Sequence, residues 1–157
     1  MQFFGIAGWG LDSSANVIYK TPAAKALLTK WVSWNKAHRR ILNADILHVR
    51  RPSGRSFDCI GHADPAPPRP GIDPRGLFLF FNPTAQNVST VFSLPLYYTG
   101  AERLANVSVS YMQSAGSVLP VGAISNASVA TATVDLDYEI EVELHIDAKG
   151  YAIATVV

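Results

Sequence analysis

The segment from Tyr138 to Ile146 constrains the fold of this chain more than any other stretch. Apolar and polar residues alternate strictly over its nine positions. The polar positions are Glu139, Glu141, Glu143 and His145. A period of two is typical of a β-strand with one buried and one solvated face. The chain is therefore predicted to contain a sheet that covers an apolar core on one side.

Short strand-like runs surround this segment in the sequence. They are mostly apolar or alternating, and turn residues such as those at 147–150 separate them. The predicted strands are 45–49, 57–62, 76–81, 88–94, 104–112, 117–121, 127–134, 138–146 and 151–157. Many short strands joined by turns are typical of an antiparallel β-sandwich. We therefore predict a mainly β chain.

One long amphipathic helix is predicted before the strands. Thr21 suits an N-cap, Pro22 suits the first helical position, and Asn43 suits the stop. Apolar residues recur between them at helical spacing. Lys and Arg occupy most of the opposite face, which we interpret as solvated rather than as a nucleic-acid surface, because no aromatic residues interleave with the charges.

The proline-rich stretch 64–75 is predicted to be an exposed loop within the sandwich, because it holds five of the ten prolines. Net charge also changes here. Residues 1–75 carry eleven Lys and Arg against five Asp and Glu, net +6, and residues 76–157 carry two against seven, net −5. We interpret this as a basic helix and connection followed by an acidic sheet.

Composition excludes several classes of protein. Hydrophobic residues make up 48% of the 157 residues, which is too many for a disordered chain. The single cysteine, Cys59, cannot form an intrachain disulfide and is predicted to be a buried, unreactive thiol. No apolar run reaches the roughly 18–20 residues of a membrane-spanning helix, so no membrane partner is expected.

A series of motifs along the first two thirds of the chain resembles a known family. The motifs are Tyr19-Lys-Thr-Pro22, Trp31-Val-Ser-Trp34, His38-Arg-Arg-Ile-Leu-Asn-Ala-Asp45, Ile46-Leu-His-Val-Arg-Arg-Pro52, Gly54-Arg55, Gly76-Leu-Phe-Leu-Phe-Phe-Asn-Pro83 and Leu94-Pro-Leu-Tyr-Tyr-Thr-Gly100. In this order they resemble the C-terminal part of α-galactosidase-like glycoside hydrolases. In those proteins a (β/α)8 barrel is followed by an antiparallel β-sandwich.

The resemblance implies a division of the chain and a function. Residues 1–44 would be the last strand, at 3–8, and the last helix of the barrel, and residues 45–157 would be the C-terminal sandwich. The catalytic carboxylates of such enzymes lie on barrel strands that this sequence does not contain. The expected role is a non-catalytic domain or fragment that serves carbohydrate metabolism with a missing barrel domain. A stand-alone carbohydrate-binding or adhesion module is the alternative, and no cofactor is expected.

Five residues are candidates for contact with a carbohydrate. Trp9 follows what would be the last barrel strand, at the end where active-site residues gather. Arg50 and Arg51 could clamp a carboxylate or sugar hydroxyls through their guanidinium donors, or form salt bridges between helix and sandwich. Tyr97 and Tyr98 could form a binding platform, or one ring could cap the sandwich.

Three Asn-X-Ser sequons are possible N-glycosylation sites and favour an extracellular route. They begin at Asn87, Asn106 and Asn126. A metal site at His48 and His62 is not expected, because no further ligand has suitable spacing. Trp31 and Trp34 follow the apolar stripe of the helix and are predicted to be core residues.

Overall fold

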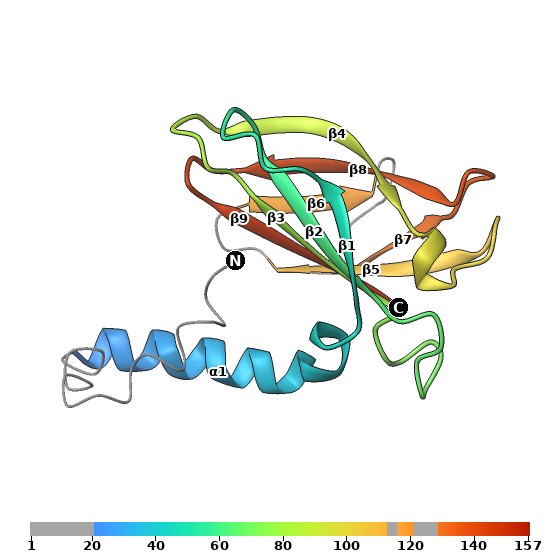
Figure 1. Ribbon diagram of the computed structural model, residues 1–157, viewed down its shortest axis with the longest axis horizontal. Coiled ribbons are helices and arrows are strands. Elements are labelled where there is room, and N and C mark those ends of the chain that lie inside the picture. The colour runs from blue at the N-terminus through green and yellow to red at the C-terminus, as the bar shows by residue number, and fades with distance from the viewer. Residues whose placement is uncertain (1–20, 113–115, 121–128) are drawn as a thin grey trace. The chain divides into compact units, whose positions relative to one another are not determined.

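The computed structural model describes residues 21–112, 116–120 and 129–157 (Figure 1). The predictions for the strand at 3–8, Trp9 and Asn126 lie outside these residues. The chain divides into two compact units, 1–39 and 40–157. In the first unit the described residues form most of helix α1, which spans Pro22–Leu42.

The second unit is the predicted antiparallel structure. The nine strands of the described residues are β1 (Asp45–Arg50), β2 (Asp58–Ala63), β3 (Gly76–Phe81), β4 (Val88–Pro95), β5 (Asn106–Met112), β6 (Gly116–Pro120), β7 (Val129–Thr133), β8 (Glu139–Ile146) and β9 (Tyr151–Val156). A short 3-10 helix, η3 (Tyr97–Thr99), follows β4. Each strand predicted from residue 45 onward is confirmed to within a few residues, and so is the mainly β fold.

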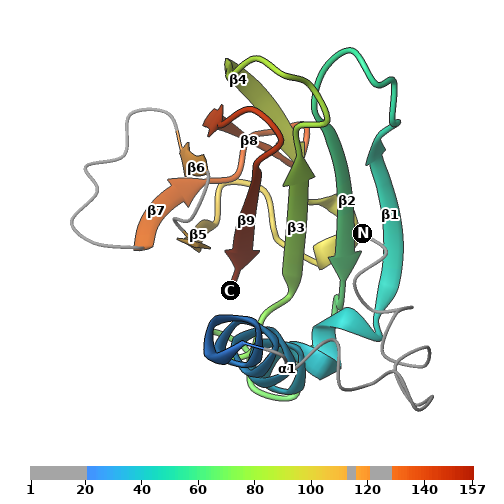
Figure 2. The same cartoon turned by 90° about the vertical axis from the view of Figure 1, so that its left-hand side faces the viewer.

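The strands form two sheets. The larger has the order β1-β2-β3-β9-β5-β7, and the smaller has the order β4-β8-β6. All neighbouring strands in these two orders pair antiparallel. Figure 2 shows β1, β2, β3 and β9 side by side. The C-terminal strand β9 therefore lies in the middle of the larger sheet, where it pairs with β3 and β5.

The main core lies between the two sheets. The alternation in β8 buries Ile140, Val142, Leu144 and Ile146, each at most 3% exposed. The larger sheet contributes aromatic side chains, among them Phe78 and Phe80 of β3. Burial of apolar area stabilises the fold by about 25 cal/mol per Å². The strict period of two is therefore stabilising, because it places every second side chain of β8 in this core.

Part of the other face of the larger sheet is also buried. Leu77 and Ile153 alternate with core residues in β3 and β9 and are at most 3% exposed, as is Ile41 in the last turn of the helix. Ile41 is the buried residue of α1. The last turn of the helix thus belongs to the sandwich unit, whose boundary lies between Arg39 and Arg40.

The two helix tryptophans are half-buried, not the core residues that the apolar stripe predicts. The rings of Trp31 and Trp34 meet edge to face at 5.7 Å between centroids. The ring of His38 stacks on Trp34 at 4.5 Å, and its Nδ1 lies 2.8 Å from the Trp34 carbonyl oxygen. These contacts are local to the helix. No helix among the described residues is long and apolar enough to cross a membrane.

Candidate functional site

Two exposed tyrosines stand on η3, directly after β4. Tyr97 and Tyr98 are each 62% exposed. Their neighbours Leu96 and Thr99 are fully buried, and the Thr99 hydroxyl donates to the Leu96 carbonyl at 2.6 Å. The turn is therefore anchored on both sides of the tyrosines, and both rings are held at the surface. Burial and hydrogen bonding, rather than a flexible loop, set their position.

Gly100 ends this turn and has a geometry that only glycine fits. Its φ is +70°, and a Cβ at this position would lie 2.8 Å from the carbonyl oxygen of Pro65. The Gly100 carbonyl accepts a hydrogen bond of 3.1 Å from Arg75 Nη1. The turn is thereby tied to the start and the end of the proline-rich loop.

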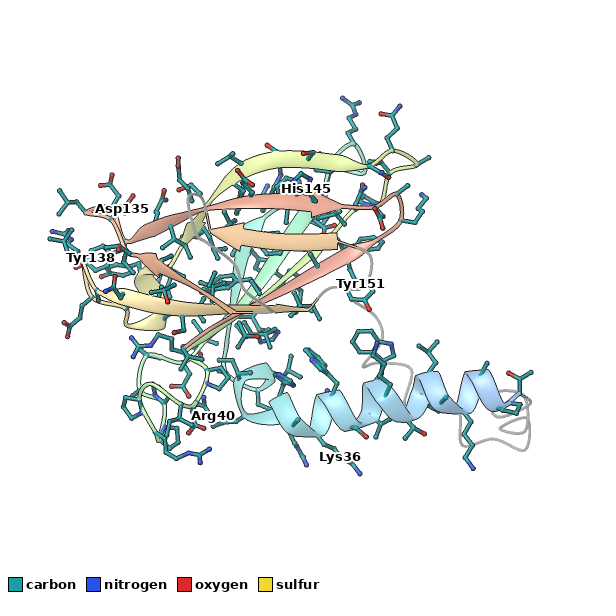
Figure 3. The ribbon with its side chains drawn as sticks, turned by 180° about the vertical axis from the view of Figure 1, so that it is seen from behind. Lys36, Arg40, Asp135, Tyr138, His145 and Tyr151 are labelled. Atoms are coloured by element: carbon teal, nitrogen blue, oxygen red, sulfur yellow. The ribbon has the colours of Figure 1, made fainter. Side chains whose placement is uncertain are left out.

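A third tyrosine comes from the turn between β7 and β8. Asp135 organises that turn, because its Oδ1 accepts the backbone N–H groups of Asp137 at 2.9 Å and Glu139 at 2.7 Å. Tyr138 follows with a left-handed φ of +63°, and its carbonyl accepts the Leu96 N–H at 2.7 Å. Figure 3 shows Asp135 and Tyr138 together at one end of the sandwich.

The three tyrosines and Arg103 form one group, which we call the tyrosine cluster. The ring of Tyr97 is perpendicular to those of Tyr98 and Tyr138, at 89° and 5.2 Å between centroids in both pairs. The Arg103 guanidinium carbon lies 4.5 Å from the Tyr138 ring centroid. The two exposed rings are therefore not a flat platform but two walls that meet at a corner.

Two leucines extend the apolar surface beside the cluster. Leu104 is 68% exposed and Leu136 is 63% exposed. Leu104 also has a φ of +58°, a conformation that costs an L-residue roughly 1–2 kcal/mol. Strained backbone of this kind gathers at binding and catalytic sites. Exposed apolar side chains and strain at one end of the sandwich make this the best candidate site in the described chain.

No contact between the predicted arginines, Arg50 and Arg51, and the tyrosine cluster is present among the described residues. The guanidinium carbon of Arg50 lies 4.1 Å from the ring centroid of Phe57, a core residue. Arg51 follows β1 and is exposed. The helix end is instead joined to the sandwich through Arg40, which pairs with Asp64.

Two of the three sequons lie on described, exposed positions. The side-chain oxygen of Asn87 accepts the Ala148 N–H at 3.0 Å. That of Asn106 accepts the Thr133 hydroxyl at 2.9 Å. Both hydrogen bonds use the amide oxygen, so the amide nitrogen that would carry a glycan is not the atom engaged.

The other chemistry-bearing residues fit structural roles. Cys59 is fully buried, and burial, with a smaller contribution from Asp58, raises the pKa of its thiol. Burial lowers the pKa of His62, which is 4% exposed, and the backbone of Ala44 opposes that shift. Within the described ranges, no three His, Cys, Asp or Glu side chains are grouped so that they could hold a metal ion.

The glutamates of β8 line its outer face. Glu141 and Glu143 are exposed, and they pair across the sheet with Ser93 and Val91 of β4. Glu139 is half-buried and accepts a hydrogen bond from the Ser93 hydroxyl. This regular row is a solvated sheet face, in line with the alternation of the sequence.

Sequence reasoning found Tyr97 and Tyr98 but missed Arg103 and Tyr138. The alternation marks Tyr138 only as the first apolar residue of its strand, and Arg103 is one of just two Lys or Arg residues after position 75. That rarity was the available signal for Arg103. Nothing in the sequence indicates that the two turns meet.

Fold and site together define a mainly β protein of two antiparallel sheets with an exposed aromatic cluster at one end. Comparison with protein-family models, with curated proteins and with solved structures finds no match.

Proposed function

We propose that this chain is a non-catalytic β-sandwich module that binds carbohydrate at the tyrosine cluster. The observation that carries the proposal is the pair Tyr97 and Tyr98, each 62% exposed on an anchored turn. Two large aromatic rings that stay exposed to water do not contribute the stability that their burial would give the fold. Their exposure therefore has a reason outside the fold, and a ligand supplies one.

The geometry of the cluster suits a sugar ring. A pyranose has faces of C–H groups, which pack on aromatic faces, and a rim of hydroxyls, which need hydrogen-bond partners. The perpendicular rings of Tyr97 and Tyr98 offer two walls against which one ring packs at a corner. Glu102, Arg103 and Asp137 are exposed on the same two turns and offer acceptors and donors to the hydroxyls.

We propose further that the module serves a glycoside-hydrolase-like parent protein. The support is the ordered series of motifs in the sequence, together with a helix followed by an antiparallel sandwich, which is the order that the resemblance implies. Hydrolysis of a glycoside needs two carboxyl groups that flank the scissile bond. The carboxylates of β8 stand in a row on a solvated strand face, so the chemistry is assigned to the parent and not to this chain.

Affinity electrophoresis through gels that contain single polysaccharides tests the binding function. The natural protein should be retarded by at least one polysaccharide, and Tyr97→Ala or Tyr98→Ala should abolish the retardation. The matched control is Phe81→Ala, which removes another exposed aromatic ring of the same unit, 42% exposed on β3. Circular dichroism verifies that each variant is folded.

Two results would contradict the proposal. One is the absence of retardation in every gel, and the other is equal retardation of the natural protein and both tyrosine variants. A separate assay with p-nitrophenyl α- and β-galactosides is expected to show no release of nitrophenolate. Turnover that disappears on substitution of one Asp or Glu would show that the chain is an enzyme.

A further inference from the structure

Arg103 lies beside Tyr138 in the tyrosine cluster. It is exposed, and its guanidinium lies over Tyr138, 4.5 Å from the ring centroid. The cation–π contact with this ring restrains the position of the guanidinium. The side chain is thus held in position before a ligand arrives, which reduces the entropy lost on binding.

The Arg103 guanidinium has no ion-pair partner in the part of the chain that the structure describes. Among the residues that the structure describes, the ion pairs are those of Arg40 with Asp64 and Arg69 with Asp73. No hydrogen bond from Arg103 to another described residue is present, and its guanidinium lies over the ring of Tyr138. An exposed, oriented arginine with free donors matches a carboxylate, which accepts two parallel N–H bonds from the guanidinium fork.

The neighbouring carboxylates do not fill this role. Asp135 uses Oδ1 to accept two backbone N–H groups of its own turn. Glu139 accepts the Ser93 hydroxyl. Glu102 and Asp137 are exposed on the flanking turns and form no ion pair with Arg103 in the described chain. Their charge weakens the attraction of the site for any anion, but direct pairing at contact distance outweighs more distant, solvent-screened charges.

We propose that the tyrosine cluster selects a saccharide that carries a carboxylate, a uronic-acid-type sugar, through bidentate pairing with Arg103. This inference rests on the proposed carbohydrate-binding function and names its ligand class. The carboxylate pairs with the guanidinium edge, and the C–H face of the same or the next sugar residue packs on Tyr97 or Tyr98. Arg103 sets the preference for an acidic over a neutral sugar. The tyrosines contact acidic and neutral sugars alike.

Titration calorimetry with paired probes tests the inference. The probes are oligogalacturonate, oligomannuronate and oligoglucuronate, each beside its methyl ester, which keeps the sugar and removes the charge. At least one free acid is expected to bind about tenfold or more tightly than its ester, the order of magnitude of a charge-assisted bidentate contact. Arg103→Gln should reduce the ratio of acid to ester affinity to about one while the ester still binds.

Arg50→Gln is the matched control, because Arg50 also lies over an aromatic ring, that of Phe57. The Arg50→Gln substitution should leave the ratio of acid to ester affinity unchanged. Asp137→Asn should raise the affinity for the acid about twofold, because it removes a nearby like charge. Binding of the acid should also weaken as salt is added.

The outcomes separate this inference from the function on which it rests. Equal binding of acids and esters, or binding of neutral polysaccharides alone, overturns the uronate preference and leaves carbohydrate binding in place. If Arg50→Gln abolishes the preference for acid over ester and Arg103→Gln does not, the assignment of the uronate site to the tyrosine cluster is overturned. If neither acids nor esters bind and no polysaccharide retards the protein, both proposals fail.

Discussion

Arg40, in the last turn of α1, forms an ion pair with Asp64, the first residue of the proline-rich loop. The other terminal nitrogen of Arg40 donates to the carbonyl of Pro74, near the end of the same loop. Asp64 N–H also donates to the Arg75 carbonyl at 2.8 Å, so the loop closes on itself at this point. One side chain therefore holds both ends of the loop against the end of the helix.

Arg40→Gln is expected to destabilise the sandwich unit by about 1–2 kcal/mol, because it removes a partly buried ion pair and a hydrogen bond. The side chains of Arg40 and Asp64 are 34% and 22% exposed, so solvent screens part of the attraction. Urea unfolding of Arg40→Gln, Asp64→Asn and the double variant measures the coupling, expected at about 0.5–1 kcal/mol. Arg69→Gln, which breaks the more exposed pair with Asp73, is the control and should cost less. Additive effects of the two substitutions would contradict the pairing.

His62 is expected to make the stability of the unit depend on pH. Burial lowers its pKa in the folded state below the ordinary value of 6.5, so the folded protein favours the neutral ring and the unfolded chain binds the proton more tightly. Stability is therefore full above pH about 6.5 and is lost as pH falls from there toward the folded-state pKa. His62→Leu should remove this part of the pH dependence in urea titrations at a series of pH values. His48→Gln, at an exposed position of β1, is the control, and an unchanged pH profile in His62→Leu would show that another group is responsible.

Asn82 is expected to be the most costly polar residue to replace. It is fully buried, and its Nδ2 donates to the carbonyls of Gln86 at 2.7 Å and Asp147 at 3.0 Å. Its Oδ1 accepts the N–H and the hydroxyl of Thr84. Asn82→Leu leaves these groups unpaired and should lower the free energy of unfolding by about 2–4 kcal/mol.

Thermal and urea unfolding of Asn82→Leu measure this loss. Asn87→Ala is the control, because Asn87 is exposed and accepts one backbone hydrogen bond. A loss for Asn82→Leu no larger than that for Asn87→Ala would mean that water replaces the lost partners.

The strands were predictable because each has its own local signal. In β8 the alternation of Ile140, Val142 and Leu144 with glutamates is visible without any partner strand. In α1 the cap at Thr21 is confirmed, since its hydroxyl oxygen accepts the Ala24 N–H at 3.1 Å. The turn η3 has no such signal, because three residues are too few to show a period.

The candidate site was predictable only in part. Tyr97 and Tyr98 are adjacent in the sequence and could be singled out as a pair, but their perpendicular arrangement comes from the buried anchors on either side. Arg50 could be singled out as a basic residue, but its packing on Phe57 depends on how β1 meets the start of β2. Neither the angle between the tyrosine rings nor the packing of Arg50 on Phe57 can be derived from the local sequence.

The sequence by itself determined the class of fold, the position of the helix and the bounds of most strands, since these depend on periodicity and on residues near in the chain. Tertiary structure alone decided the strand order, in which β9 lies between β3 and β5. It also decided that the turn of Tyr97 meets the turn of Tyr138. The physical reason is that both outcomes depend on contacts between residues far apart in sequence, whose free energy exists only once the two sheets have closed on their common core.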